Sequence, residues 1–229
     1  PFTAVELITT TSSVFFLFFS INGMKSIAPR ALAEAGKLRY LPRTSLGKVI
    51  SPIHALAIFI PILLFTIIVP LCELRQPGWM LQYSLPTIGK LLGPEWVSSM
   101  GGEEQAKAAL RITASVTLCC LTWVNMWIMR TFLGAQWAAI GVREKPTIVS
   151  TGPYGLVRHP LYSIMLAIEI CFVIMFWSYV PLVAGAIVAI CFAIKMPIEE
   201  ELMEEDPTIG QLYKEYKKEV RARVIPLLW

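Results

Sequence analysis

Residues 145–162 read KPTIVSTGPYGLVRHPLY and lie between two strongly apolar segments. The stretch combines a Gly-Pro turn, a basic pair, a His-Pro step and two tyrosines. A linker between membrane helices needs polarity and turn residues, but it does not need this concentration of ionisable and aromatic side chains. Tyr154 and Tyr162 alone could be ordinary interfacial aromatics. A second polar cluster, KMPIEE at 195–200, follows the next apolar hairpin. Both clusters are therefore expected at the same membrane face.

The composition of the chain indicates an integral membrane protein. Of its 229 residues, 55% are hydrophobic and only 16% are charged, with a mean hydropathy of +0.62. Soluble domains are nearer a quarter charged. The net charge of +4 is modest and spread over the loops, which argues against nucleic acid as a partner. The cysteines form no CxxC motif and no Cys/His cluster, so we expect neither a disulfide framework nor a metal site.

Five apolar segments are candidate membrane spans, since a span needs about 20 mainly apolar residues. They cover residues 5–21, 49–71, 108–129, 161–177 and 181–194. The last two are joined by a short turn and predict an antiparallel hairpin. The first has no basic region before it and is interpreted as a membrane helix, not a signal peptide. The predicted fold is all-α, with about five transmembrane helices, a helical hairpin and a cytosolic helical tail.

The distribution of basic residues predicts the orientation. Sixteen of the 20 Lys and Arg residues lie on the side that holds residues 22–48, 130–160 and the tail, and four lie on the other side. The positive-inside rule then places both polar clusters at the cytosol. We expect a short surface helix within 23–48 and a cap formed by 72–107. In the tail, Tyr213, Tyr216 and Val220 recur at helical spacing and predict a helix face packed under the bundle.

The polar clusters carry the candidate chemistry. Glu199 and Glu200 next to Lys195, facing a loop with Arg158 and His159, would make a charged pocket at a membrane edge. Ionisable groups near a bilayer are costly and are usually functional when they are not solvated. The alternative is that residues 199–205 begin a solvated acidic helix, because carboxylates are favoured at a helix N-terminus.

Together the two clusters resemble the isoprenylcysteine carboxyl methyltransferase family. The resemblance covers about residues 130–229, which we treat as a methyltransferase core after an N-terminal part, 1–129, made of the first three helices and their loops. It implies a location in the endoplasmic reticulum. It is specific for a wider superfamily of membrane methyltransferases and less specific for the substrate. The matching residues are Gly152-Pro153-Tyr154, Val157-Arg158-His159-Pro160, Tyr162, Met196-Pro197, Glu199-Glu200, Gly210, Tyr213 and Tyr216.

The resemblance implies an S-adenosylmethionine site. Main-chain groups of one loop segment would read the adenine edge, a second segment would line the ribose and methionyl parts, and a carboxylate would pair with the ammonium group. The absence of a G-x-G-x-x-G loop excludes a Rossmann-type methyltransferase. The implied cofactor-binding residues are, in that order, Thr147, Ile148 and Val149; Tyr154, His159, Pro160, Leu161 and Tyr162; and Glu199 with Glu200 beside it.

The implied reaction is methyl transfer to the C-terminal carboxylate of a prenylated cysteine. The partner would be a prenylated protein or a small lipophilic carboxylate that reaches the enzyme through membrane lipid. A carboxylate is ionised at pH 7, so no strong base is needed. A cationic side chain should bind the acceptor carboxylate. The family places an Arg four residues before the Glu, and here that position is Lys195, a point charge instead of a bidentate fork. Arg158 is the other candidate catalytic cation.

Other functions remain open from the sequence. One is methylation of another lipophilic acid or of a phospholipid amine. Another is an NADPH-dependent membrane sterol reductase, although the phosphates of that cofactor would call for arginines where the tail begins with acids. A third is a membrane scaffold or transport protein without catalysis. The presence of Tyr154, His159, Tyr162 and Glu199 together argues against the last, because a decayed site should lose some of them.

Overall fold

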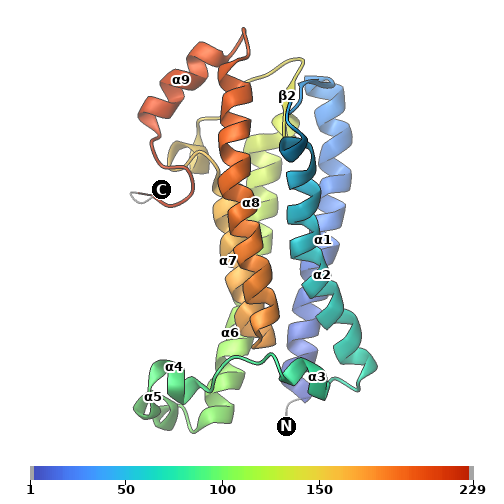
Figure 1. The fold of residues 1–229 in the computed structure, drawn as a ribbon, viewed down its shortest axis with the longest axis vertical. Coiled ribbons are helices and arrows are strands. Elements are labelled where there is room, and N and C mark those ends of the chain that lie inside the picture. Colours follow the sequence, from blue (N-terminus) through green and yellow to red (C-terminus); the bar gives the residue numbers. More distant parts are fainter. Residues whose placement is uncertain (1–2, 227–229) are drawn as a thin grey trace. The chain divides into compact units, whose positions relative to one another are not determined.

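The computed structural model describes residues 3–226, and this range is almost entirely helical (Figure 1). The long helices are α1 (Thr3–Ala35), α2 (Ser45–Leu71), α6 (Glu103–Ile128), α7 (Pro160–Phe176) and α8 (Tyr179–Glu204). The short ones are α3 (Gly78–Leu81), α4 (Ile88–Leu92), α5 (Pro94–Ser99), α9 (Gly210–Glu219) and the turns η1 (Met129–Leu133), η2 (Gly134–Gln136) and η3 (Gly152–Gly155). Two short strands, β1 (Leu38–Tyr40) and β2 (Val142–Arg143), complete the described elements.

The long helices have the length and composition of membrane spans. Four of them meet that requirement, over Ala4–Ala35, Ser45–Leu71, Glu103–Gln136 and Tyr179–Glu204. The fifth apolar helix, α7, has 17 residues, a rise of about 26 Å against a hydrocarbon core of about 30 Å. The prediction of an all-α membrane fold is confirmed, and each predicted span falls within one of these helices, except for Trp177, which follows α7.

The prediction of a separate surface helix after residue 22 is wrong, because α1 continues without interruption to Ala35. Ile27, Ala31 and Ala35 are buried at a spacing of four residues, which keeps one face of the helix apolar for two further turns. Outside this stripe, Arg30 and Glu34 form an ion pair at 2.8 Å across one turn. The polar residues after position 22 therefore lie on the outer face of a long helix.

The acidic run after Lys195 lies at the end of a helix, not at its start. Helix α8 extends to Glu204, so Glu199 and Glu200 fall in its last turns. The alternative of an acidic helix N-terminus is therefore wrong. The C-terminal end of a helix carries partial negative charge, so carboxylates there are unfavourable unless cations compensate for them.

The chain forms two compact units, and each long helix contributes a segment to both. Unit 1 contains Pro1–Phe18, Ala57–Thr122 and Ala167–Ala186; unit 2 contains Phe19–Leu56, Trp123–Leu166 and Ile187–Trp229. In unit 1 the rings of Phe65 and Phe176 stack at 4.2 Å, and Phe16 meets Phe172 edge-on at 5.2 Å. The segment predicted as a cap folds into α3 to α5, and the Glu103 carboxylate accepts hydrogen bonds from the first turn of α4. Figure 1 shows α4 and α5 beside the start of α6.

In unit 2, loops and the tail are fixed at the ends of the long helices. Strands β1 and β2 pair antiparallel, with Leu38 opposite Arg143 and Tyr40 opposite Val142. Helix α9 turns back beside the end of α8 (Figure 1). This return needs Gly210, because a Cβ there would collide with the main-chain carbonyl of Glu204. Tyr213 and Tyr216 are buried on the inner face of α9, as the spacing in the sequence predicts.

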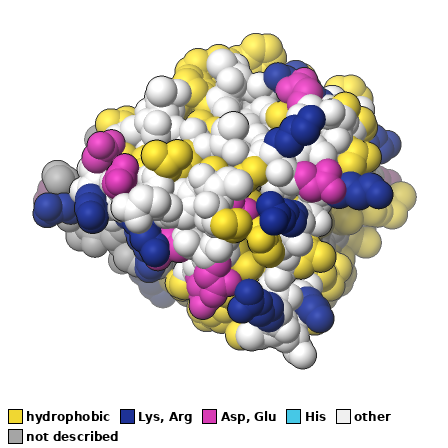
Figure 2. Space-filling view, turned by 90° about the horizontal axis from the view of Figure 1, so that it is seen from above, with side chains coloured by type: hydrophobic (Ala, Val, Ile, Leu, Met, Phe, Trp, Pro, Cys, Tyr) yellow, Lys and Arg dark blue, Asp and Glu magenta, His cyan; other side chains and the backbone are white. Residues whose placement is uncertain are grey.

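The outer surface of unit 2 changes character along the helices. Figure 2 shows the end that carries β2 and α9, where Lys and Arg side chains lie next to Asp and Glu. One such pair joins Arg43 to Glu205 at 3.2 Å. Along the helices themselves the exposed side chains are apolar, including Val49, Leu56 and Ile190. An apolar wall below a polar end is the surface expected where a bundle emerges from a bilayer.

Candidate active site

Two neighbouring carboxylates organise the polar end of unit 2. Glu199 and Glu200 follow one another on α8, and consecutive residues of a helix point about 100° apart. The two side chains therefore meet different partners, although both receive contacts from the loop that leads into α7. Because their partners differ, Glu200 is enclosed by other side chains whereas Glu199 remains more accessible.

Glu200 lies at the centre of a closed ion cluster. Its side chain is 2% exposed. One carboxylate oxygen, Oε1, lies 2.9 Å from Nε of Arg158 and 3.2 Å from Nε2 of His159. The other, Oε2, lies 3.2 Å from Nη2 of Arg223 and 3.3 Å from Nζ of Lys217. Three cations and an imidazole thus surround this carboxylate, which offsets the unfavourable helix end.

The C-terminal strap, defined here as residues 220–224, binds the start of α7 through its main chain. All five of its carbonyls accept hydrogen bonds from donors at positions 158, 159 and 163. The strap therefore fixes the loop on one side while Glu200 fixes it on the other. The bonds run from Nη1 of Arg158 to Val220 and Arg221 (both 2.7 Å), from the Arg158 main chain to Ala222 (3.0 Å), from the His159 main chain to Arg223 (2.8 Å) and from Oγ of Ser163 to Val224 (2.6 Å).

Glu199 has fewer partners and is more accessible. Its side chain is 14% exposed. Oη of Tyr162 donates a hydrogen bond of 2.6 Å to Oε1 of Glu199. Nδ1 of His159 lies 3.6 Å from Oε2, and Nζ of Lys195 lies 3.6 Å from Oε1. One tight hydrogen bond and two longer contacts leave room for a further cationic partner.

Aromatic rings order the same residues. The Tyr162 ring stacks on His159 with centroids 5.3 Å apart and on Phe192 at 4.2 Å. The ammonium of Lys195, a residue only 3% exposed, lies 5.1 Å from the centroid of the Tyr162 ring. A buried ammonium over an aromatic face gains a cation–π contribution. Because Phe192, Lys195 and Glu199 are three and four residues apart, they share one face of α8.

Local geometry brings the loop to this face. Gly152 has φ of +60°, and a Cβ there would collide with the ring of Phe132, so η3 requires glycine at this position. Tyr154 is buried in η3, and Oη of Tyr216 donates a hydrogen bond of 2.6 Å to its carbonyl. Burial raises the pKa of Tyr154, and the nearby Tyr216 and Glu199 raise it further. Burial also raises the pKa of Tyr216 to about 12, so both phenols are neutral at neutral pH.

The other predicted cofactor residues lie around this centre and not within it. The main-chain N–H of Thr147 donates to Oε1 of Gln136 at 3.2 Å. Ile148 packs against Tyr213 and Tyr216. Between residues 3 and 226 no main-chain hydrogen bond joins Ile148 or Val149 to another residue. Leu161 packs in an apolar cluster with Met126 and Met129, away from the carboxylates.

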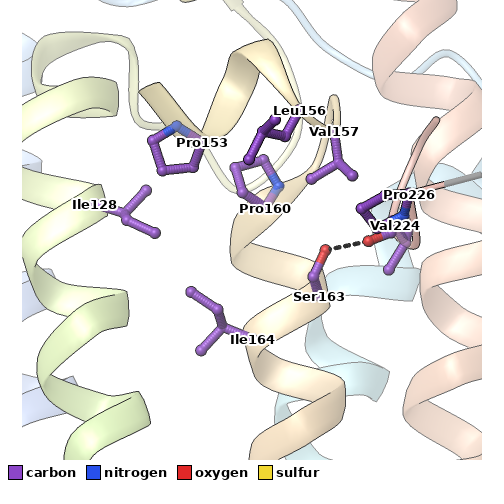
Figure 3. A pocket seen from close by; sticks show the side chains of 9 residues that line it. All are labelled: Ile128, Pro153, Leu156, Val157, Pro160, Ser163, Ile164, Val224 and Pro226. Atoms are coloured by element: carbon purple, nitrogen blue, oxygen red, sulfur yellow. Dashed lines mark hydrogen bonds between the residues drawn. The ribbon is translucent and has the colours of Figure 1, made fainter. Parts of the chain in front are cut away.

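Pro160 borders an apolar groove of about 230 Å³ between α6 and α7 (Figure 3). The lining includes Ile128, Leu156 and Ile164, and its one polar side chain, Ser163, is already bonded to the strap. Residues 160, 163 and 164 share one face of α7, whereas position 162 lies on the opposite face by helical periodicity. The groove is therefore separate from the cluster around Glu199.

Sequence reasoning missed three residues that the structure brings to the cluster. Lys217 and Arg223 are tail residues that bind Glu200, and an acidic run followed by a basic run was the available signal for them. His54, on α2, lies with its ring centroid 5.3 Å from that of Phe192. An ionisable residue inside a predicted membrane span was the signal for His54.

The region that contains the carboxylates matches one protein-family model. Residues 110–206 match the family model described as phospholipid methyltransferase. Over these residues the chain is similar to a family of membrane methyltransferases. This family is of the isoprenylcysteine carboxyl methyltransferase-like kind, so the resemblance is confirmed. The matched range includes Arg158, His159, Tyr162, Lys195 and both glutamates, and it ends before the strap. The chain matches no curated protein.

Proposed function

We propose that the protein transfers a methyl group from S-adenosylmethionine to the C-terminal carboxylate of a prenylated cysteine, in a protein or in a small lipophilic acid. The single observation that carries this proposal is Lys195. It is a buried ammonium, 3% exposed, beside Glu199 and over the Tyr162 ring. A buried ammonium beside the more exposed carboxylate, Glu199, is suited to bind an anionic acceptor.

The residues present fit the proposed cofactor by their chemistry. S-Adenosylmethionine carries an ammonium group and a sulfonium, so its binding site needs a carboxylate and aromatic faces. Glu199 supplies the carboxylate, since it is 14% exposed whereas Glu200 is 2% exposed and surrounded. Tyr162 and His159 supply stacked rings next to it. The free main-chain groups of Ile148 and Val149 suit the edge of an adenine.

In this proposal the side chains position groups and move no proton. The cofactor supplies an electrophilic methyl group on sulfur; its transfer to a carboxylate oxygen forms the ester C–O bond, and the electrons of the broken S–C bond stay on sulfur. Lys195 offsets the repulsion between the acceptor carboxylate and Glu199. Tyr162, held by Glu199 and by stacking, fixes the distance between the two sites. Alignment of this kind can supply several kcal/mol of the barrier.

Arg158 is less suited than Lys195 to the role of the catalytic cation. Its guanidinium already binds Glu200 and two carbonyls of the strap. Its role in the proposal is therefore to hold the loop. The prenyl chain would remain in the hydrocarbon region, where each buried CH₂ contributes about 0.8 kcal/mol. The cofactor would arrive from the cytosol, as the distribution of basic residues predicts, and the family resemblance implies that the membrane is the endoplasmic reticulum.

A second candidate is methylation of a phospholipid amine, which the description of the matching family favours. An amine acceptor would benefit from Glu199 and would be repelled by Lys195 when protonated. Replacement of this one cation therefore has opposite consequences for the two acceptors.

The test combines binding and turnover in purified, detergent-solubilised protein. We expect the wild type to bind S-adenosylhomocysteine, not NADPH, and to methylate N-acetyl-S-farnesylcysteine. Lys195→Met should lower kcat/KM for this acid roughly tenfold to a hundredfold, since a hydrogen bond to a charged group contributes about 1.5 to 3 kcal/mol. Lys195→Arg keeps the charge and is the matched control. Methylation of phosphatidylethanolamine that improves in Lys195→Met would favour the second candidate instead, and binding of NADPH alone would refute both.

A further inference from the structure

Helix α2 carries two buried polar groups without partners in unit 2. Oγ of Ser51 and Nδ1 of His54 are both buried, and neither hydrogen-bonds to any residue in the range 3–226. The main chain of Ser51 interacts with the His54 ring but lacks the geometry of a hydrogen bond. The two residues are three positions apart and share a face of the helix. In a membrane span an unsatisfied polar group is costly, so a pair of them on one face suggests a ligand.

The His54 ring points toward the proposed acceptor site. It meets the Phe192 ring at 5.3 Å with an angle of 53° between the planes, and Phe192 in turn stacks on Tyr162 at 4.2 Å. Lys195 lies on the same face of α8 as Phe192, and its charge acts on the His54 imidazole. His54 is thus linked to the proposed acceptor site through the Phe192 ring and through its electrostatic interaction with Lys195.

A carboxylate acceptor needs more than Lys195 provides. It has two oxygens, and an ammonium is a point charge that does not grip both in a fixed plane. Tyr162 does not supply the second donor, because its hydroxyl donates to Glu199. A neutral imidazole has one N–H donor and one acceptor nitrogen, and a serine hydroxyl adds another donor. These groups lie on α2, which contacts α8 through the rings of His54 and Phe192.

We propose that His54, with Ser51 beside it, binds the acceptor carboxylate together with Lys195. The inference rests on the proposed function and extends it, since it makes α2 part of the acceptor site and gives the carboxylate donors on two helices. His54 is a binding and orienting residue in this scheme, whereas Glu199 and Tyr162 serve the cofactor side.

The experiment separates acceptor binding from cofactor binding in the full chain. The variants are His54→Leu, which removes both nitrogens, His54→Asn, which keeps a polar atom near the position of Nδ1, and Ser51→Ala. Ile53→Ala is the matched control, because Ile53 is 42% exposed on the same helix. For each protein, one titration uses S-adenosylhomocysteine, one uses N-acetyl-S-farnesylcysteine and one uses the methyl ester of that acid. Initial rates of methyl transfer complete the set.

We expect His54→Leu to weaken binding of the acid roughly tenfold to a hundredfold, with binding of the ester and of S-adenosylhomocysteine within twofold of the wild type. His54→Asn should recover part of the loss, and Ser51→Ala should show a smaller effect of the same kind. Equal losses for acid, ester and S-adenosylhomocysteine would assign His54 to packing and overturn the inference, as would wild-type acid binding in His54→Leu. A wild type that binds S-adenosylhomocysteine but neither binds nor methylates the acid would instead refute the proposed acceptor, and the inference with it.

Discussion

Each unit buries charged side chains within its helices, but the two units satisfy them differently. In unit 1, Nη2 of Arg111 lies 2.8 Å from Oε1 of Glu6, and Nε of Arg111 donates to the carbonyl of Met175 at 2.6 Å. Gln76 joins Glu6 to the carbonyl of Phe176. This set consists of one cation, one anion, the Gln76 side-chain amide and two main-chain carbonyls. In unit 2, Glu200 is closed in the same manner, whereas Glu199 beside it remains partly open. The comparison separates charges whose partners all lie within the protein from Glu199, which is 14% exposed and accepts one short hydrogen bond.

The largest effect should follow from opening the closed cluster of unit 2. Glu200→Gln leaves the buried Arg158 without its carboxylate partner and removes the shared anion of the partly exposed Arg223 and Lys217. We expect a loss of about 3 to 5 kcal/mol of unfolding free energy. Thermal unfolding in detergent measures it. Glu199→Gln is the control: its stability should change by less than about 1 kcal/mol, while its affinity for S-adenosylhomocysteine falls roughly tenfold or more. Similar losses of stability in both variants would remove the distinction between the two carboxylates.

The ion pair of unit 1 offers a second test of the same distinction. Glu6→Leu alone should cost about 3 kcal/mol, because it leaves Arg111 buried without a counterion. The double variant Glu6→Leu with Arg111→Met should recover most of that loss, since apolar replacements of a buried pair are often neutral. A double-mutant cycle on unfolding temperatures quantifies the coupling. Affinity for S-adenosylhomocysteine should stay at the wild-type value throughout, and a lost affinity in the stable double variant would show that this pair also serves the site.

The smallest effect concerns a carboxylate of which one oxygen, Oδ1 of Asp206, accepts hydrogen bonds from main-chain and hydroxyl donors. Asp206 precedes α9 and accepts hydrogen bonds from the main chain of Thr208 at 2.8 Å and of Ile209 at 3.2 Å. Burial by itself would raise the pKa of Asp206, but the hydrogen bonds from Thr208 and Ile209 lower it below its ordinary value of 3.8. Its contribution to stability is therefore complete above about pH 4 and is lost as the pH falls through the lowered pKa.

Asp206→Asn should lose about 1 kcal/mol at neutral pH, as removal of a helix cap does, and this difference should shrink as the pH is lowered below 4. Unfolding temperatures of both proteins between pH 7 and pH 3 test it. A difference that grows toward low pH would contradict the assigned sign.

Much of the fold was predictable because hydrophobic length and spacing are local properties. The five apolar spans, the hairpin between α7 and α8 and the buried tyrosines of α9 all follow from such patterns. Helix ends were not predictable to the same degree. Nothing local shows that α1 runs on to Ala35 or that α8 includes Glu204, because neighbours from other helices bury the faces that stabilise these extra turns.

The candidate site was predictable in part. The His-Pro loop and the paired glutamates were identified from their residue types, and both lie in the region that matches the methyltransferase family. The different roles of the two glutamates were not predictable, because the sequence does not show which partners each of two adjacent side chains meets. The contributions of Arg223, Lys217 and His54 depend on contacts over long sequence separations, and no periodic pattern encodes these.

The sequence by itself therefore determined an all-α membrane protein, the two clusters that carry ionisable side chains and their resemblance to a family of membrane methyltransferases. These depend on composition, on runs of apolar residues and on motifs that are contiguous in the chain. Only the tertiary structure decided that three cations surround Glu200, that the strap at 220–224 binds the loop, and that Glu199 is more exposed than Glu200. The reason is physical: the cost of a buried charge depends on which partners surround it, and those partners are set by the packing of helices that lie far apart in the sequence.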